Sequence, residues 1–520
     1  MIAMPTPKEL ELKLELAPAD LRRLKQIPLL RAVSDKPQRS HQVSVYFDTD
    51  KFKLRREGLT LRVRHIGERR IQTVKATSNA KLFERDEWEY DVAGDGPDLD
   101  LAADTALGPL LGKKMRSRLK PVFETRVSRT VYPLSRQGQE IALSIDRGRI
   151  KTTDRSAALC EVELELEQGD QNRLLFEIAR ELNRTIPVQL AFKSKAERGY
   201  ELLDGGPDAP VQATTLDVHR GMSTRSAFQV IARSCLKQIV GNQPAVLKGN
   251  PDGVHQMRIG IRRLRAAMSA HRELLGDEQS NAIKGELKWL ARELTPAREL
   301  DVLLTRVVSP LTRGKSRIKS NGLSTLPRAL VKERKQAYRV ACDAVTSARY
   351  RELALNTAEW IEAGRWLDQQ DDLLRNRANM PVETFAAEEL QRRWRKFRKK
   401  AKNLAELNAQ DRHKCRIQGK KLRYAAEFFA EAFPTKRAQK RLSKFTSALK
   451  KMQDGLGELN DIAVHENRVA AMGLQRPDGS RKKAFEAGLL AGREDARYDA
   501  AMRAAVKAYD ELAVAKPFWR

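Results

Sequence analysis

The stretch Glu9–Leu16 reads ELELKLEL and alternates strictly between charged residues and leucine. On an α-helix the four leucines would scatter around the axis, whereas on a β-strand they occupy one face. The opposite face of such a strand is wholly charged. The stretch therefore predicts a strand with one apolar face and one charged face.

Similar short segments recur further along the chain, and turn residues such as Gly58, Gly67 and Gly138 lie between them. Several short strands separated in this way are typical of an antiparallel sheet or barrel. The segments are Leu61–Arg64 (LRVR), Thr73–Lys75 (TVK), Arg85–Glu89 (RDEWE), Glu124–Arg126 (ETR) and Cys160–Glu167 (CEVELELE).

The charged faces allow two interpretations. Any one of them is most simply a solvated outer face. Taken together, they offer acid pairs and base pairs at i, i+2, and same-face neighbours on a strand lie about 6.5 to 7 Å apart. Paired carboxylates at that distance repel each other unless a cation lies between them. If these faces point into a closed barrel, the acids could hold Mg²⁺ or Mn²⁺, and the bases could hold an anion with several charges.

The overall composition excludes several classes of protein. The chain has 520 residues, 32% charged and 6% aromatic, and no apolar run long enough for a membrane helix. The first residues carry Glu and Lys without an apolar stretch, which argues against a secretory signal. Four cysteines without paired spacing argue against a disulfide framework or a Cys-based zinc site. We expect a cytoplasmic protein with no membrane partner.

The net charge of +30 is unevenly distributed along the chain. Residues 1–216 hold 37 Lys and Arg against 33 Asp and Glu, a net of +4, so residues 217–520 carry 98 − 37 = 61 against 68 − 33 = 35, a net of +26. Such a field attracts polyanions. The stretch Leu202–Asp217 is interrupted by Gly206, Pro207 and Pro210, and predicts a domain boundary. We place one domain at 1–203, a linker at 204–219 and a helical domain at 220–515.

The charged segments of residues 5 to 203 resemble those of a known protein family. The ExExK pattern of Glu9–Lys13 is similar to the N-terminal signature of the CYTH domain, the triphosphate tunnel metalloenzymes. Later segments follow in the family's order over about residues 5 to 203: Tyr46–Thr49, the Arg62/Arg64 strand, Lys75, Arg85–Glu89, Arg126, Asp146, the Glu161/Glu163/Glu165 strand, and Ser194-Lys195 before Arg198–Tyr200.

The resemblance implies an α+β fold with an antiparallel eight-stranded tunnel barrel and flanking helices, and Mg²⁺- or Mn²⁺-dependent cleavage of triphosphate. It implies metal ligands at Glu9, Glu11, Asp146, Glu161 and Glu163, and phosphate ligands at Lys13, Arg62, Arg64, Lys75, Arg126 and Lys195, with Glu9, Glu11 and Lys13 as catalytic residues. Glu165 continues the acidic face and Lys193 shares a face with Lys195, so both remain alternatives. Glu87 and Glu89 are expected to form ion pairs with the tunnel arginines.

The second part of the chain contains an internal repeat. Residues 255–265 (HQMRIGIRRLR) and 413–423 (HKCRIQGKKLR) share His, Arg, Ile, a basic pair, Leu and Arg at identical spacing, with an offset of 413 − 255 = 158. His, Arg, Arg or Lys, and Arg at i, i+3, i+7 and i+10 share one helix face. A basic stripe is usually a solvated face balanced by acids. This one has no such acids, so we expect an anion to bind it.

This repeat resembles the CHAD domain, a conserved-histidine helical module, over roughly residues 220 to 510. The resemblance implies an all-α domain of two pseudo-symmetric four-helix bundles, repeat units 220–375 and 376–515, around a basic cavity that binds inorganic polyphosphate. The histidines lack carboxylate partners at i+3 or i+4, so phosphate contact or packing is favoured over metal binding. The implied polyphosphate ligands are His255, Arg258, Arg262, Arg263, Arg265, His413, Arg416, Lys420, Lys421 and Arg423.

The leading functional hypothesis is a triphosphatase acting on inorganic tripolyphosphate, joined to a polyphosphate-binding domain. Two alternatives stay open: a non-catalytic protein that binds polyphosphate and localises to it, as at polyphosphate granules, and a tunnel enzyme acting on thiamine triphosphate or ATP. Aromatic platforms and nucleic-acid-reading motifs are sparse, so no specific nucleic acid is expected. No obligatory protein partner is evident.

Overall fold

In a computed structural model the chain folds as two compact units. The first unit comprises Met1–Gln212, Leu236–Lys248 and Val345–Gly364, and the second comprises Ala213–Cys235, Gly249–Ala344 and Arg365–Arg520. The structure describes residues 9–24, 26–33, 36–76, 84–168, 171–206, 209–305, 325–474 and 481–520. Across these residues, no helix combines the length and the apolar character needed to cross a membrane.

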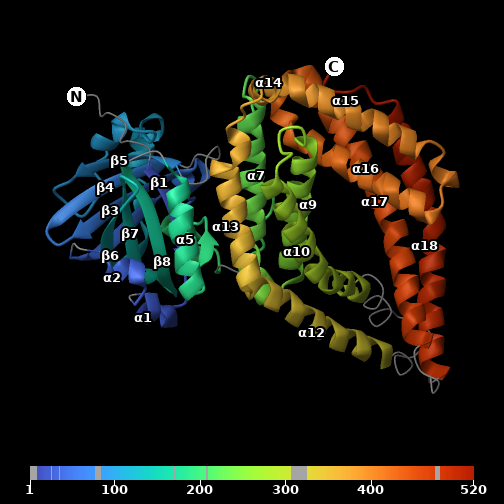
Figure 1. Cartoon of the computed structure of the whole chain (residues 1–520), viewed down its shortest axis with the longest axis horizontal. Coiled ribbons are helices and arrows are strands. Elements are labelled where there is room, and N and C mark those ends of the chain that lie inside the picture. Colours follow the sequence, from blue (N-terminus) through green and yellow to red (C-terminus); the bar gives the residue numbers. More distant parts are fainter. Residues whose placement is uncertain are drawn as a thin grey trace. The chain divides into compact units, whose positions relative to one another are not determined.

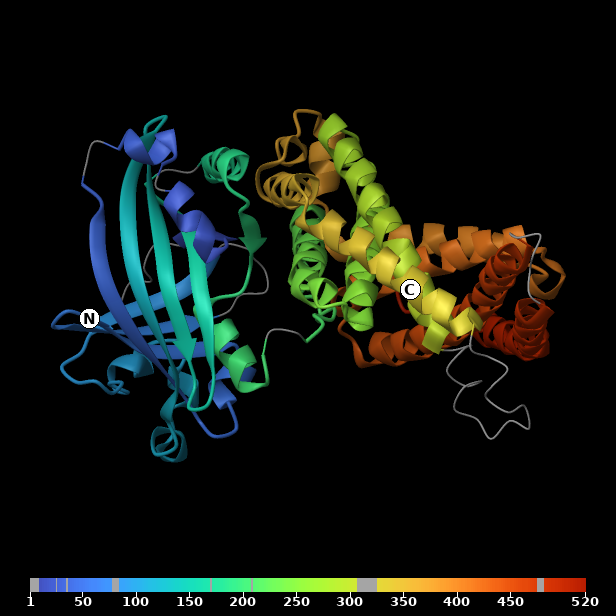
Figure 2. The ribbon, with the colours of Figure 1, turned by 90° about the horizontal axis from the view of Figure 1, so that it is seen from below.

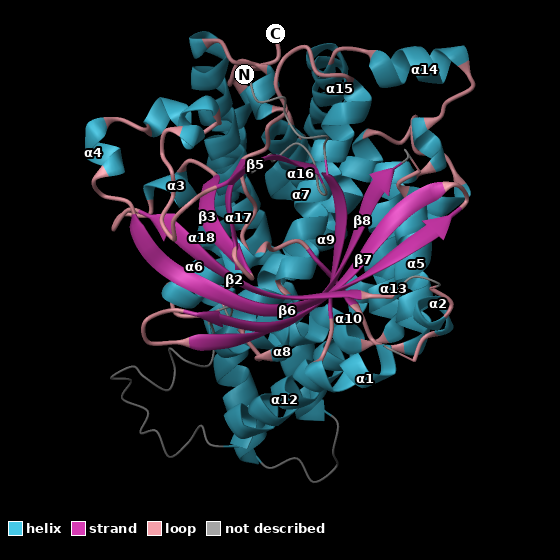
Figure 3. Ribbon diagram, turned by 90° about the vertical axis from the view of Figure 1, so that its left-hand side faces the viewer, coloured by secondary structure: helices cyan, strands magenta, loops and turns pink. Residues whose placement is uncertain are grey.

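The first unit is built on a nine-stranded antiparallel sheet that closes on itself (Figures 2 and 3). The strand order is β5-β4-β3-β2-β6-β7-β8-β1-β9, and a further pairing of β1 with β5 joins the ends of an eight-strand ring, leaving β9 beside β1. The strands are β1 Glu9–Glu15, β2 Gln38–Asp48, β3 Leu59–Ile66, β4 Arg69–Ala76, β5 Glu84–Asp91, β6 Lys120–Arg136, β7 Gln139–Lys151, β8 Ser156–Gln168 and β9 Gln189–Ala191.

The alternation in β1 has the predicted consequence. Leu12 and Leu14 are buried on one face of the strand, and α5 (Arg173–Thr185) packs against β1 and β8. Lys13 lies on the other face, where it meets Glu163 of the neighbouring strand β8. The prediction of an antiparallel tunnel with flanking helices is thereby confirmed. The short helices of this unit are α1 Leu21–Leu24, α2 Pro28–Arg31, α3 Lys53–Arg56, α4 Lys113–Arg116 and α6 Lys195–Leu203.

A buried carboxylate fixes the corner between β2 and α3. Asp48 is fully buried, and its oxygens accept hydrogen bonds from the backbone N–H groups of Leu54 (2.9 Å) and Arg55 (3.0 Å). The hydroxyl of Tyr200 donates a further bond of 2.8 Å to Asp48. These bonds satisfy N–H groups at the start of the helix that would otherwise lack partners. They also tie α6, which carries Tyr200, to the barrel.

The rest of the chain is helical (Figure 1). Its helices are α7 Thr224–Gly241, α8 Gln243–Leu247, α9 Pro251–Ala270, α10 Glu278–Leu303, α12 Thr325–Thr346, α13 Ala348–Ala363, α14 Asp372–Asn379, α15 Val382–Ala401, α16 Ala409–Phe428, α17 Lys436–Leu474 and α18 Arg481–Ala513.

The helix starts reproduce the 158-residue repeat. Adding 158 to the first residues of α7, α9 and α10 (224, 251 and 278) gives 382, 409 and 436, where α15, α16 and α17 begin. The same offset relates Ser223 to Pro381, and these two residues form an isolated antiparallel bridge. The repeat seen in the sequence is therefore a repeat of structure, in which α9 and α16 are equivalent helices.

Helix α13 belongs to the first unit although it lies far along the sequence. It packs on α5 and β9. Arg180 of α5 forms an ion pair with the buried Glu359 at 2.5 Å, and Arg351 donates a hydrogen bond of 2.8 Å to Asn183. The predicted uninterrupted domains 1–203 and 220–515 thus differ from the compact units, because the barrel unit includes part of the helical sequence.

Candidate functional site

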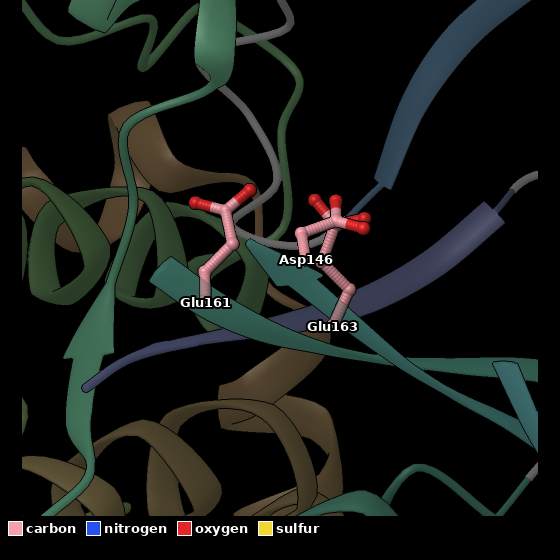
Figure 4. A group of neighbouring side chains, drawn as sticks. All are labelled: Asp146, Glu161 and Glu163. Atoms are coloured by element: carbon pink, nitrogen blue, oxygen red, sulfur yellow. The ribbon is translucent and has the colours of Figure 1, made fainter. Parts of the chain in front are cut away.

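Three carboxylates meet inside the barrel. Asp146 of β7 and Glu161 and Glu163 of β8 each offer an oxygen within 4.8 Å of the others (Figure 4). Their exposed fractions are 0%, 1% and 6%. The register places Asp146 directly opposite Glu161, and residues two apart on β8 share a face. Carboxylates buried this close together repel each other unless cations balance them.

Four cationic side chains balance this acidic cluster, which we define as Asp146, Glu161 and Glu163. One of them, Arg198, lies 3.4 Å from Glu161. The Nζ atom of Lys195 lies 2.8 Å from Asp146, 2.5 Å from Glu161 and 2.8 Å from Glu163. Lys13 lies 2.5 Å from Glu163 and 2.7 Å from Glu11. Arg129 holds Asp146 through two hydrogen bonds of 2.7 and 2.8 Å and also contacts Glu163.

A helix cap positions Lys195. The Ser194 hydroxyl accepts a hydrogen bond from the Glu197 backbone N–H (3.1 Å), and the Glu197 carboxylate accepts one from the Ser194 N–H (2.7 Å). This reciprocal capping box fixes the first turn of α6. Lys195 is the first residue of that helix, so its direction into the barrel follows from the local sequence. The alternative, Lys193, instead pairs with Glu201 at 2.7 Å.

The charged groups of the cluster shift one another's pKa values. Burial alone would raise the pKa of Glu163, but Lys13, Lys195 and Arg129 outweigh it and hold that pKa well below its usual value. The pKa of Glu161 is raised by burial and by repulsion from Glu163, although Lys195 opposes both. Burial lowers the pKa of Lys195, yet the carboxylates around it raise the net value well above normal.

A second group of charged side chains lies on β3, β4 and β5. Together with the acidic cluster and its cations, they form what we call the charged lining of the barrel. Arg62 lies 3.6 Å from Glu87 and Arg64 lies 3.8 Å from Glu89, while Lys75 forms a closer pair with Glu87 at 2.5 Å. Glu87 and Glu89 therefore form the expected ion pairs. The Nε atoms of both arginines are buried and have no hydrogen-bond partner among the described residues. Such donors are well suited to an anion with several oxygens.

Two arginines of β6, Arg126 and Arg129, have different partners in the structure. Arg126, predicted to bind phosphate, is exposed and pairs with Glu124 at 2.7 Å, so it does not join the charged lining. Arg129 instead contacts the acidic cluster, at Asp146 and Glu163, and the sequence interpretation missed it. The β6–β7 hairpin turns at Gln137 and Gly138 and pairs Arg129 with Asp146. Counting strand partners outward from that turn would have revealed Arg129.

Three further acids of the sequence prediction are Glu9, Glu11 and Glu165. The side chain of Glu9 lies outside the described residues, although its backbone belongs to β1. Glu11 is described and contacts Lys13. Glu165 continues the face of Glu163, and burial together with Glu11 and Glu163 raises its pKa to about 7.

The acidic cluster fits a divalent cation by the chemistry of its donors. Mg²⁺ and Mn²⁺ prefer carboxylate oxygens, and Asp146, Glu161 and Glu163 bring such oxygens together in a buried place. The negative charge of these acids is large enough to be contacted by four cationic side chains, Lys13, Arg129, Lys195 and Arg198. The residues present are therefore compatible with a metal centre.

The helical unit contains a basic cavity of about 1350 Å³. Seven of the ten residues predicted to bind polyphosphate line it: His255, Arg258, Arg262, His413, Arg416, Lys420 and Arg423. They come from the equivalent helices α9 and α16. The walls formed by α17 and α18 are already ion-paired, with Arg497 at 2.5 Å from Glu458 and Lys451 at 3.3 Å from Glu511. The basic side chains of the lining are most numerous on α9 and α16, where Arg423 also pairs with Glu427 at 3.4 Å.

This crowding of cations changes their proton affinities. Burial, followed by repulsion from Arg416, Arg262 and Arg423, lowers the pKa of Lys420 to about 7. Burial and the neighbouring Arg262 lower the pKa of Arg258 to about 10. Burial and nearby arginines lower the pKa of His255 to about 4. The cavity is therefore an electrostatically unfavourable arrangement that a bound polyanion would relieve.

The other three predicted ligands lie elsewhere. Arg263 is buried, with its guanidinium 5.5 Å from the centre of the Phe428 ring, so it is a packing residue. Arg265 and Lys421 also do not appear among the described residues that line the cavity. Consecutive helical residues point about 100° apart, so the predicted single stripe divides over different faces of α9 and α16.

Two models of known protein families match separate parts of the chain. Residues 7–200 match the model of the CYTH domain, and residues 230–470 match the model of the CHAD domain.

Solved structures similar to parts of the chain include both kinds of protein. The CHAD domain from the plant Ricinus communis is 27% identical, with a TM-score of 0.48, and the match covers 57% of this chain and 97% of that one. PptA from Streptomyces chartreusis is 18% identical, with a TM-score of 0.40, covering 56% of this chain and 100% of PptA. HpAC1 from Hippeastrum, described as an adenylyl cyclase candidate with a dominant triphosphatase activity, is 18% identical, with a TM-score of 0.27, covering 37% of this chain and 95% of HpAC1.

Proposed function

Because the chain contains a CYTH domain followed by a CHAD domain, we propose that it hydrolyses inorganic tripolyphosphate to diphosphate and phosphate and that its helical part binds inorganic polyphosphate. The observation that carries the catalytic proposal is the buried acidic cluster facing a row of arginines and lysines. A protein that only binds anions has no use for clustered carboxylates at the binding site. The binding-only alternative is for that reason the weaker one.

The roles proposed for the residues follow from their charges. Asp146, Glu161 and Glu163, with Glu11 beside them and Glu9 from the predicted set, would hold Mg²⁺ or Mn²⁺. A cation bound there supplies charge that neutralises phosphate oxygens and lowers the pKa of an attacking water.

The cationic side chains would bind and orient the substrate. Phosphoryl transfer depends chiefly on positioning and on charge neutralisation, and needs little covalent chemistry from the protein. Arg62 and Arg64 would bind phosphate oxygens through Nε donors that are buried without a hydrogen-bond partner among the described residues, and Lys75, now paired with Glu87, would add a third cation. Lys13 and Lys195 lie at the acidic cluster and would orient the phosphate that is attacked.

The test is phosphate release by the purified protein from tripolyphosphate, thiamine triphosphate, ATP and long-chain polyphosphate, each with Mg²⁺, with Mn²⁺ and without metal. We expect metal-dependent release that is strongest with tripolyphosphate. Glu163→Gln should lower kcat by about a hundredfold or more, since one carboxylate of the cluster loses its charge. Glu124→Gln is the control, because Glu124 lies outside the acidic cluster and pairs with the exposed Arg126. Release without metal, or full activity in Glu163→Gln, would contradict the catalytic proposal.

Polyphosphate binding in the cavity is tested separately. Arg262→Gln combined with Lys420→Gln removes two basic side chains from the wall of the cavity that α9 and α16 form. This variant should lose polyphosphate affinity and keep tripolyphosphate hydrolysis. Lys451→Gln is the matched control, since Lys451 lines the same cavity but is exposed and paired with Glu511. Equal loss of binding and hydrolysis would mean that both depend on one site.

A further inference from the structure

The side chain of Lys195 lies against every member of the acidic cluster. Its Nζ atom is 2.8 Å from Asp146, 2.5 Å from Glu161 and 2.8 Å from Glu163. The three carboxylates belong to adjacent strands and lie close together inside the barrel (Figure 4). The Lys195 side chain is only 12% exposed, so the acids rather than water balance its charge. Its ammonium group therefore lies among the same oxygens that a divalent cation would bind.

The other cations at the acidic cluster make fewer contacts with it. Lys13 and Arg198 each lie within ion-pair distance of one of the three acids, and Arg129 lies within that distance of two. Arg198 is also held by a hydrogen bond of 3.0 Å to the backbone carbonyl of Ala158. Among the ion pairs of the described residues, only Lys195 joins all three carboxylates.

The ammonium group satisfies one oxygen of the cluster incompletely. Glu161 is 1% exposed, and its Oε1 atom is buried without a hydrogen bond among the described residues, although Nζ of Lys195 is 2.5 Å away. The pair is thus a charge contact without the alignment of a hydrogen bond. A buried carboxylate oxygen in this condition is costly. A divalent cation would satisfy it, because bonds from Mg²⁺ or Mn²⁺ to carboxylate oxygens need no N–H direction.

The side chain of Lys195 can move while its helix stays in place. The capping box of Ser194 and Glu197 fixes the backbone at the first turn of α6. The Nζ atom is carried on a flexible four-carbon stem with three rotatable donors. A buried ammonium group that leaves one anion needs another, because an unpaired buried charge is unfavourable. A phosphate group in the barrel is an anion of that kind.

We propose that Lys195 is a displaceable internal cation, which competes with a divalent cation for the acidic cluster and moves to a phosphate oxygen when triphosphate enters the barrel. The proposal rests on the hydrolysis proposed above and concerns how the site is loaded. Two cations held this close together in a buried place repel each other strongly. The three carboxylates therefore hold either the ammonium group or the metal closely, and not both.

Cooperative binding of metal and triphosphate follows from this competition. Phosphate draws Lys195 away from the carboxylates and leaves them for the metal, and the metal frees Lys195 for phosphate. If triphosphate raises the affinity for the metal by some factor, the metal must raise the affinity for triphosphate by the same factor. The protein would then bind metal weakly by itself and firmly together with its substrate.

The experiment measures Mn²⁺ binding to the full chain at one fixed pH, by calorimetry and by the electron paramagnetic resonance signal of the free ion. Each titration is made with metal alone and with imidotriphosphate, a triphosphate analogue whose bridging nitrogens resist hydrolysis. A variant with Asp146→Asn and Glu161→Gln identifies any Mn²⁺ that binds outside the acidic cluster, and that signal is subtracted.

The test variant is Lys195→Gln, which removes the charge and keeps most of the side-chain length. Lys193→Gln is the matched control, because Lys193 is two residues away and pairs with Glu201 at 2.7 Å. Lys13→Gln separates displacement from a general change of charge, since it removes a buried cation that contacts one acid of the cluster. Circular dichroism verifies that each variant is folded.

With metal alone, Lys195→Gln should bind Mn²⁺ about tenfold or more tightly than the wild type, while Lys193→Gln should stay within about twofold. Lys13→Gln should gain clearly less than Lys195→Gln. Imidotriphosphate should raise the Mn²⁺ affinity of the wild type by about ten- to a hundredfold, and that of Lys195→Gln by a smaller factor.

A measurement on the wild type needs no variant. Chemical labelling of lysine amines, read by peptide mass spectrometry, should find Lys195 more reactive with Mn²⁺ than without it, while Lys193 is unchanged. This result tests the displacement directly even if Lys195→Gln does not fold.

Four results would overturn the proposal: unchanged Mn²⁺ affinity in Lys195→Gln, an equal gain in Lys13→Gln, an analogue effect of the same size in Lys195→Gln and the wild type, or labelling of Lys195 that does not respond to Mn²⁺. Failure of both the wild type and Lys195→Gln to bind Mn²⁺, with or without the analogue, would contradict the proposed function itself. The two kinds of failure are therefore distinguishable.

Discussion

Replacing Lys420 by methionine should stabilise the ligand-free protein, and more so at low pH. Lys420 lies in the basic cavity, and burial with repulsion from Arg416, Arg262 and Arg423 lowers its pKa from 10.5 to about 7. Below pH 7 the lysine is charged in both the folded and the unfolded chain, so the cost of burying that charge is fully present. Between pH 7 and 10.5 the folded protein releases the proton first, and the stability of the wild type rises with pH.

The magnitude follows from the change in proton affinity. A fall from 10.5 to about 7 corresponds to an upper bound of about 5 kcal/mol, at about 1.4 kcal/mol for each tenfold change. Water reaches the open cavity and screens the repulsion, so we reduce this figure to about 2 kcal/mol at pH 6. The advantage of the methionine variant should shrink by about 1 kcal/mol or more by pH 9.

The assay is urea unfolding of the full chain, followed by the far-ultraviolet helical signal at pH 6 and pH 9. Lys451→Met is the control, because Lys451 lines the same cavity but is exposed and lies 3.3 Å from Glu511. Added polyphosphate should reverse the order of stability at pH 6, since a bound anion favours the charged lysine. A methionine variant less stable than the wild type at pH 6, or an advantage that does not change with pH, would refute the reasoning.

Further predictions concern the barrel. Arg129→Ala should lower kcat/KM for tripolyphosphate by about a hundredfold, while Arg126→Ala should stay within about twofold, because Arg129 holds the acidic cluster and Arg126 is exposed. The reverse order would restore the sequence-based assignment. Asp48→Asn should lower the free energy of unfolding by about 1 to 3 kcal/mol, because the helix N–H groups and Tyr200 lose a charged acceptor. Tyr200→Phe should cost less in the same urea titration. Chelation of divalent ions should abolish hydrolysis and leave polyphosphate binding intact, which comparison of both assays in EDTA would establish.

The fold was predictable because its signals are periodic. The alternation of Glu9–Leu16 fixes which face of β1 is buried, and a 158-residue offset in the sequence reappears in the helix starts. Side-chain position within an element is harder to predict. Arg126 and Arg129 lie three residues apart on one strand, and only the register of the hairpin with β7 shows which of them meets Asp146.

The same limit applies to the helical part. Lys420 and Lys421 look interchangeable in a run of basic residues, yet Lys420 lines the cavity and Lys421 is repelled chiefly by Arg393 and Lys396 of α15. The neighbours that decide this difference come from α15, which lies about thirty residues earlier in the chain, and from α9 of the first repeat. Spacing along one helix carries no information about such neighbours. The pKa of Lys420 depends partly on Arg262 of α9, so it could not be predicted from spacing along α16 alone.

The packing of α13 on α5 affects how the gene can be divided. A fragment ending at residue 203 would contain every described residue of the acidic cluster, but it would leave Arg180 without Glu359 and uncover the part of α5 that α13 covers. Such a fragment would contain the proposed site and could still precipitate on storage. Its failure in an assay would then report a missing helix rather than a missing catalyst. Dissection of this protein should therefore rely on point variants in the full chain.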